Sequence, residues 1–140
     1  MRFWDASAII PLCVKESPTA LVRRIVEEDG ALVVWWTTPV ECYSAFARRR
    51  RDDILTRAQE DQARQAILRL AVDWSEVQPS YQVRDAVGRV LLLHPLRGAD
   101  ALHLAAALVW ADGRAARHHF VSLDKRLREA AQREGFEVLP

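Results

Sequence analysis

Four acidic residues stand at positions where strands are expected to end or helices to begin: Asp5, Glu41, Asp100 and Asp124. In a parallel sheet, the carboxyl ends of the strands and the first turns of the following helices share one edge, which is where such folds bind ligands. We therefore expect the four carboxylates to converge. Converging carboxylates repel one another, so a positive charge is expected among them. Hard oxygen ligands without soft ones favour Mg²⁺ or Mn²⁺.

An acidic cluster that holds such an ion is suited to phosphate-ester chemistry, because the ion lowers the pKa of a bound water and stabilises charge on the leaving oxygen. Missing motifs exclude other classes of enzyme. The chain has no G-x-x-x-x-G-K-[ST] phosphate loop and no G-x-S-x-G nucleophile motif. Its two cysteines and four histidines lack the spacing of a zinc site. We expect Cys13 and Cys42 to be small buried hydrophobic residues.

Each acid also has a structural explanation as part of a helix cap. The segment Thr38-Pro39-Val40-Glu41 fits a capping box, in which the Glu41 side chain bonds back to the start of its helix. Asp124 suits an N-cap, and Asp100 suits the positive end of a helix. Asp5 resists this explanation, because Asp is depleted in strands. Capping also does not explain why all four acids meet.

Turn-forming and helix-capping residues divide the sequence into segments that predict short strands alternating with helices. The expected strands cover residues 2–5, 32–36, 74–77, 119–123 and 136–139. A short helix is expected after a cap at Ser7, and the others cover residues 18–28 (capped by Ser17), 38–51, 57–71, 80–93, 99–111 and 124–134. Parallel strands need crossover helices, so this alternation predicts an α/β fold. We expect one domain, with a parallel sheet of four to five strands flanked by helices.

The composition is that of a folded globular domain. Of the 140 residues, 50% are hydrophobic and 28% are charged, with a formal net charge of +1, which excludes intrinsic disorder. No apolar run approaches the roughly 20 residues of a membrane span, and the start of the chain makes a poor signal peptide. We therefore expect a cytoplasmic protein that does not enter a membrane.

Three segments carry a family resemblance, together with Glu41 after its proline-started helix. They are residues 5–7 (DAS), residues 96–107 (LRGADALHLAAA) and residues 120–124 (FVSLD). These segments resemble the PIN-domain ribonucleases, in particular the VapC-type toxins of bacterial and archaeal toxin–antitoxin pairs. The resemblance covers the whole chain, in order. It implies a parallel sheet flanked by helices and an endoribonuclease that depends on Mg²⁺ or Mn²⁺.

The same resemblance implies roles for residues and partners. The four acids match the metal-binding and catalytic residues of the family. Ser7 and Ser122 match positions where the family often has a hydroxyl near the site. RNA is the implied substrate, and its cleavage would inhibit translation or growth. The resemblance also implies a cognate antitoxin that covers the site, and a homodimer.

Further basic and aromatic residues lie close to these acids in the sequence. Arg97 precedes the helix of Asp100, and we expect it to contact a substrate phosphate. Arg48–Arg51 could contact RNA or an acidic antitoxin segment, but a solvated helix end is the favoured interpretation. His103 shares a helix face with Asp100, and a hydrogen-bonded core histidine is favoured there. Core positions are expected for Trp4, Trp35, Trp36 and Trp110.

Two other classes of function stay open at this point. A Mg²⁺-dependent phosphatase or phosphoacceptor also uses an Asp at a strand end, usually with a second Asp two residues later, where this chain has Ser7. A non-catalytic PIN-like binding module would use the acids only as caps. Cleavage of RNA with added metal would support the nuclease, and formation of a phosphoenzyme would support the phosphatase.

Overall fold

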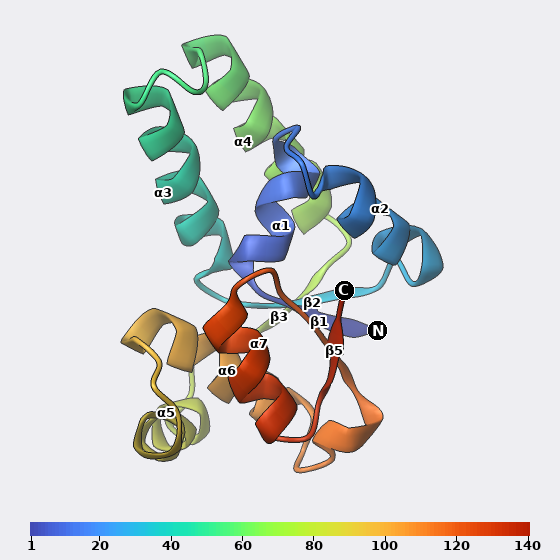
Figure 1. Ribbon diagram of the computed structural model, residues 1–140, viewed down its shortest axis with the longest axis vertical. Helices are drawn as coiled ribbons and strands as arrows, with labels where there is room; N and C mark the ends of the chain where they lie inside the picture. Colours follow the sequence, from blue (N-terminus) through green and yellow to red (C-terminus); the bar gives the residue numbers. More distant parts are fainter.

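Five short strands lie parallel in one sheet, in the order β3-β2-β1-β4-β5 (Figure 1). The computed structural model describes residues 1–140. The strands are β1 (Arg2–Trp4), β2 (Leu32–Trp35), β3 (Ser75–Val77), β4 (His119–Val121) and β5 (Glu137–Leu139). The helices are α1 (Ala6–Cys13), α2 (Thr19–Glu28), α3 (Thr38–Arg51), α4 (Arg57–Ala71), α5 (Tyr81–Leu93), α6 (Gly98–Trp110) and α7 (Lys125–Arg133), with a 3-10 turn η1 (Ala115–Arg117). The predicted α/β fold is confirmed.

Strand β1 lies at the centre of the sheet, between β2 and β4. Phe3 pairs with Val33 of β2 and with Phe120 of β4. Successive side chains of a strand point to opposite faces of the sheet, so Phe3 and Trp4 enter different cores. Both are fully buried, which confirms the expected core position of Trp4.

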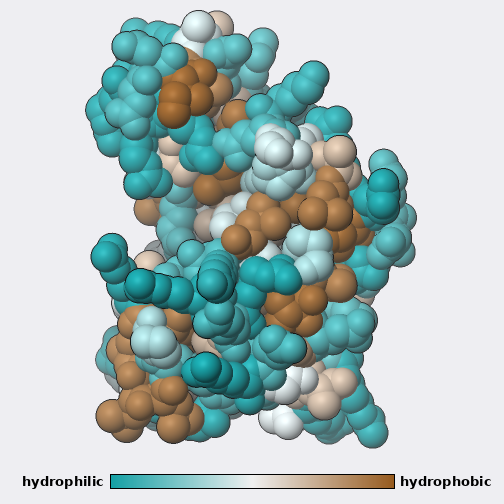
Figure 2. All heavy atoms as spheres, viewed as in Figure 1, coloured by the Kyte–Doolittle hydropathy of each residue, from teal (hydrophilic) through white to brown (hydrophobic).

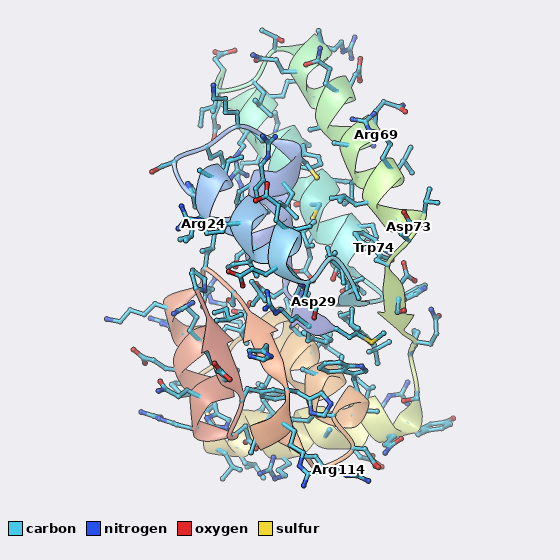
Figure 3. The ribbon with its side chains drawn as sticks, turned by 90° about the vertical axis from the view of Figure 1, so that its right-hand side faces the viewer. Arg24, Asp29, Arg69, Asp73, Trp74 and Arg114 are labelled. Atoms are coloured by element: carbon cyan, nitrogen blue, oxygen red, sulfur yellow. The ribbon has the colours of Figure 1, made fainter.

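The sheet separates two apolar cores. One face packs against α1, α2, α3 and α4, with Ile9 and Ile67 among its buried residues. The other face packs against α5, α6 and α7, with Leu104 and Leu127 buried. Figure 1 shows the first group of helices above the sheet and the second group below it, and the view in Figure 3 shows the same division. Because both faces are covered, strand β2 is a continuous apolar run with every residue buried.

The first helix begins two residues earlier than a cap at Ser7 would place it. Asp5 is its N-cap, with extended backbone angles (φ −87°, ψ 168°), and its carboxylate accepts the backbone N–H of Ser7. The prediction that Ser7 caps this helix is therefore wrong. A carboxylate at the end of β1 already has the backbone and the acceptor that a cap needs, so the expectation that Asp5 would not serve as a helix cap is also wrong.

The start of α2 also differs from the prediction, whereas that of α4 does not. Helix α2 begins at Thr19 after an N-cap Pro18 that has no side chain to bond, so Ser17 is not its cap. The Thr19 hydroxyl secures this turn by accepting the N–H of Glu16 and donating to the carbonyl of Pro11. The capping box expected at the start of α4 is present between Thr56 and Gln59.

Strand β2 ends at Trp35, one residue before the predicted end. Trp36 is 51% exposed, so its expected core position is wrong. It lies beyond the paired residues of β2, where neither core covers its side chain.

Trp35 is buried and Trp110 packs against the core beside α6. Trp74, labelled in Figure 3 where α4 leads into β3, donates its indole N–H to Glu76.

Both cysteines face the core beside α1 and α3. Cys42 is buried and Cys13 is partly buried, and burial raises the pKa of the Cys13 thiol to about 12. A thiol in this state is a packing residue rather than a nucleophile. None of the helices combines the length and the apolar character that a membrane crossing requires.

Candidate active site

One cavity at the carboxyl edge of the sheet, of about 270 Å³, is lined by all four predicted acids. Asp5 follows β1, Glu41 lies in the first turn of α3, Asp100 lies in the first turn of α6, and Asp124 is the N-cap of α7. The remaining lining residues are Ala6, Ser7, Ile10, Ser44, Ala45 and Arg48. The structure thus brings together four carboxylates from four separate parts of the chain.

Asp5 is the most buried of these acids, with 3% of its surface exposed. Its backbone N–H donates to the carbonyl of Val121, which extends the β1–β4 ladder up to the site. Its carboxylate accepts the Ser7 hydroxyl at 2.8 Å and the Ser7 backbone N–H at 3.3 Å. These bonds fix the direction of the Asp5 side chain at the floor of the cavity.

The two serines link the ends of β1 and β4. The Ser7 hydroxyl, which donates to Asp5, also accepts the backbone N–H of Leu123 at 2.8 Å. The Ser122 hydroxyl lies 3.4 Å from that of Ser7 and accepts the N–H of Asp124 at 3.1 Å. Ser7 and Ser122 therefore position Asp5 and Asp124 relative to each other.

Glu41 does not form the capping box that its position allows. The N-cap of α3 is Thr37 rather than Thr38, and it makes no side-chain capping bond. The Thr37 hydroxyl instead donates to Oε1 of Glu41 at 3.1 Å, while the Thr38 hydroxyl is buried without a partner. The structural explanation of Glu41 as a capping-box residue is therefore wrong, because its carboxylate accepts the Thr37 hydroxyl and not a backbone N–H at the helix start.

His103 bonds the same oxygen of Glu41. Its Nε2 lies 2.8 Å from Oε1, and the ring is 1% exposed. His103 is thus the hydrogen-bonded core histidine that the sequence favoured, but its partner is a residue of the candidate site. Oε1 of Glu41 is held from two elements, by Thr37 at the start of α3 and by His103 in α6.

Two carboxylates of the cavity have raised pKa values. Burial raises the pKa of Asp5, against the opposing effects of His103 and of hydrogen bonds from Ser7. Burial, followed by the carboxylate of Asp124, raises the pKa of Asp100, with a further contribution from Glu41. For Asp100, where neighbouring carboxylates add to the effect of burial, a nearby positive charge would oppose the shift.

Comparison with known proteins agrees with this architecture. The model of the PIN domain family matches residues 2–133. The chain belongs to the PIN-domain family. Two relatives are Ribonuclease VapC45 of Mycobacterium tuberculosis (strain CDC 1551 / Oshkosh) and Ribonuclease VapC49 of Mycobacterium tuberculosis (strain ATCC 25618 / H37Rv). Each is 30% identical to the chain over 146 aligned positions, which cover 99% of this chain and 94% of the relative.

Two arginines of this PIN domain lie at or near the cavity. Arg48 lines it, so the arginine run is not only the solvated helix end that the sequence favoured. Spacing could have shown this, since Ser44 and Arg48 follow Glu41 by three and seven residues and share its helix face. The predicted Arg97 is the N-cap of α6 and lies outside the lining, but its charge acts on Asp100.

The donor set of the PIN-domain cavity fits a hard divalent cation. It offers four carboxylates and no sulfur ligand, which is the ligand chemistry of Mg²⁺ and Mn²⁺. The acids surround the cavity rather than form a closed cage, since no three His, Cys, Asp or Glu side chains are gathered as a metal-binding group. Mg²⁺ is commonly held by few carboxylates together with waters and substrate phosphates, and an open arrangement leaves room for both.

Proposed function

We propose that this PIN domain is an endoribonuclease that depends on Mg²⁺ or Mn²⁺ and hydrolyses RNA phosphodiester bonds. The observation that carries the proposal is the convergence of four carboxylates from separate elements on one open cavity. Two relatives that match the chain over nearly its whole length are named ribonucleases, which supports the same reaction. Capping alone does not account for Glu41, whose carboxylate makes no capping bond and is held instead by Thr37 and His103.

Asp5 and Asp100 would hold the main ion, with Asp124 and Glu41 completing its ligands or holding a second ion. When bound, the divalent ion supplies a lowered pKa for water and neutralises charge on the reacting phosphate. Thr37 and His103 both donate to Oε1 of Glu41 and fix the direction of its carboxylate. No protein group bonds Oε2, so this oxygen is free to bind an ion. The Asp5 carboxylate is fixed by Ser7.

The arginines would bind RNA on either side of the reacting phosphate. Arg48 lines the cavity from α3, and Arg97 is exposed at the start of α6. A guanidinium suits phosphate because it donates two parallel hydrogen bonds. No side-chain nucleophile is needed, and the buried, hydrogen-bonded Asp5 is poorly placed to accept a phosphoryl group itself.

The test is an RNA cleavage assay with the purified chain, with and without Mg²⁺ or Mn²⁺, alongside Asp5→Asn. We expect cleavage only with metal and only in the unchanged protein, with new 5′ and 3′ ends inside the RNA. Equal cleavage by Asp5→Asn would indicate a contaminating nuclease. A labelled phosphoenzyme without RNA cleavage would instead support the phosphatase alternative.

We also propose that the chain is the toxin of a type II toxin–antitoxin pair, acting on RNA in the cytoplasm to inhibit translation and growth. The support is the similarity to the two VapC ribonucleases. Expression alone should stop growth, co-expression with the protein of the neighbouring gene should restore it, and Asp100→Asn should be harmless. Harmless expression of an intact, metal-competent chain would contradict the toxin role and leave the nuclease untouched.

A homodimer is part of the same proposal. Three consecutive leucines at the end of α5, Leu91, Leu92 and Leu93, are exposed, and Figure 2 shows the hydrophobic patch over this helix. Contiguous exposed apolar surface of this kind marks a protein interface. Sedimentation of the chain and of Leu92→Glu tests the proposal, with a dimer expected only for the unchanged protein.

A further inference from the structure

A second cavity, of about 550 Å³, lies between the end of β2, the start of α5 and the start of α6. Its wall is mainly apolar and aromatic. Its lining residues include Trp35, Pro79, Tyr81, Val87, Gly98 and Leu102. None of the four acids lines it. We call this space the aromatic cavity.

The aromatic cavity and the acidic cavity lie on opposite sides of one helical turn. Gly98 and Leu102, which line the aromatic cavity, are four residues apart and share a face of α6. Asp100, which lines the acidic cavity, lies between them in sequence and therefore on the opposite face. The two cavities therefore flank the first turn of α6.

The surface between the cavities suits a sugar–phosphate backbone. Arg97, Gly98 and Ala99 are all exposed. Helix α6 begins without a side-chain cap, so its first backbone N–H groups are free to bind an anion beside the Arg97 guanidinium. A phosphate-linked chain could therefore pass over this turn while its neighbouring groups enter both cavities.

The chemistry of the aromatic cavity suits a flat, aromatic ligand. Trp35 forms part of its wall, and the Tyr81 ring is 79% exposed. The guanidinium of Arg84, another lining residue, lies 5.2 Å from the centre of the Tyr81 ring. Aromatic rings and guanidinium planes are the groups on which proteins stack unpaired bases.

We propose that the aromatic cavity binds a nucleobase of the RNA strand whose phosphate lies in the acidic cavity. The cavity would then hold the strand in register and influence which sequences are cut. The inference rests on the proposed function for the identity of the ligand as RNA. The leucines at the other end of α5 leave this end of the helix available.

Gly98 allows the cavity to be filled without disturbing the fold. A Cβ at Gly98 would meet no atom within 4 Å, and the residue lies in a helix, where leucine is favoured over glycine. The Gly98→Leu side chain would therefore occupy the aromatic cavity. Gly88 in α5 has equally open surroundings and lines no part of this cavity, so Gly88→Leu is the matched control.

The experiment measures binding in EDTA, where no metal-dependent cleavage interferes. The probes are short fluorescein-labelled RNA homo-oligonucleotides and an abasic ribose-phosphate oligomer of the same length. We expect the unchanged protein and Gly88→Leu to bind the best homo-oligonucleotide about tenfold more tightly than the abasic oligomer. Gly98→Leu should bring this ratio close to one.

Three results would overturn the proposal. They are equal binding of RNA and abasic oligomer by the unchanged protein, an unaltered ratio in Gly98→Leu, and conversion of a dimer to a monomer by Gly98→Leu. The last result would assign the cavity to a second copy of the chain. Because binding is measured without cleavage, a base preference lost in Gly98→Leu supports the cavity even if the chain cuts no RNA. Metal-dependent cleavage without any base preference in binding would support the proposed nuclease activity and contradict base binding in the aromatic cavity.

Discussion

The Nε2 nitrogen of His103 lies 2.8 Å from Oε1 of Glu41, so a residue from the interior of α6 fixes a carboxylate of the candidate site. Burial disfavours a charged ring, but the hydrogen bond and charge of Glu41, with the charges of Asp5 and Asp100, raise the pKa of His103. A positive charge is thus stabilised by the carboxylates that it partly neutralises. His103 therefore both orients Glu41 and reduces the repulsion between the carboxylates of the site.

Two replacements of His103 should distinguish the effect of its hydrogen bond on activity from the effect of its charge. Gln can donate an N–H from near the position of Nε2, whereas Leu fills the space without a donor. We expect His103→Gln to keep most of the cleavage activity and His103→Leu to lose about 10- to 100-fold. Separate kcat and KM values, together with the melting temperature of each variant, test this. Equal activity of the two variants would mean that the ring only fills space.

Glu41→Gln should leave the fold intact and remove activity. Gln keeps a carbonyl oxygen that can accept from Thr37 and His103, so we expect the melting temperature without metal to change by only a few degrees. It lacks the negative charge that a metal site requires, so RNA cleavage should fall roughly a hundredfold or more. An active Glu41→Gln protein would exclude this residue from the catalytic machinery.

Asp100→Asn should make the metal-free protein as stable as the unchanged protein or more stable. Burial and the carboxylate of Asp124 raise the pKa of Asp100, so its ionised form is held at a cost that Asn removes. Saturating Mn²⁺, at about 100 times its Kd, should stabilise the unchanged protein by about 2.7 kcal/mol and leave Asp100→Asn unaffected. Thermal melts with and without Mn²⁺ test this, with the exposed Asp85→Asn as control. Loss of folding in metal-free Asp100→Asn would show that the acid is structural.

Thr38→Val should stabilise the protein, although the sequence pattern made Thr38 the expected cap. Its hydroxyl is buried and has no hydrogen-bond partner, so its removal relieves a desolvation cost of about 1–3 kcal/mol. The neighbouring Thr37→Val should instead weaken cleavage, because the Thr37 hydroxyl bonds Glu41. Melting temperatures and cleavage rates of Thr38→Val and Thr37→Val test whether the first gains stability and the second loses activity. A destabilised Thr38→Val would restore the capping interpretation.

Stability at low pH should depend on Glu134, which connects α7 to α5. Its carboxylate receives both terminal nitrogens of Arg89, at 3.2 and 3.0 Å, and lies 2.7 Å from Nε2 of His94. Although burial acts against it, hydrogen bonds from His94 and Arg89 lower the pKa of Glu134 below its usual 4.5. A lowered folded-state pKa gives stability that is present above the unfolded pKa and lost as the pH falls through the folded value.

Glu134→Gln should therefore be less stable than the unchanged protein at neutral pH, and the difference should shrink as the pH falls below about 4.5. Melting temperatures over a pH series test this. Glu129→Gln, an exposed position on α7, is the control and should follow the unchanged protein throughout. A difference between Glu134→Gln and the unchanged protein that is constant with pH would mean that the carboxylate acts through packing alone.

The order and type of the elements could be predicted because local rules determine them. Helix α4 occupies the predicted residues 57–71, since its capping box defines the start within the sequence itself. The strand runs were recognisable because both faces of the sheet are covered, and the parallel topology then placed the four acids at one edge.

The details that depend on how elements meet could not be predicted. Thr37 rather than Thr38 bonds Glu41 because α3 has its N-cap at Thr37, and His103 reaches Glu41 only because α6 packs beside that turn. Trp36 is exposed because the sheet stops at its neighbour, which an apolar run does not reveal. These contacts follow from tertiary packing, which local propensity does not encode.

The central place of β1 has a consequence for the newly made chain. One edge of this first-synthesised strand pairs with β4, in a ladder that joins Phe3 to Phe120, so that edge stays open until most of the domain has been translated. Asp124 and the Leu123 N–H that holds Ser7 arrive later still. Long-range pairing of this kind folds slowly and late. The candidate site would therefore stay incomplete until nearly all of the domain has been synthesised.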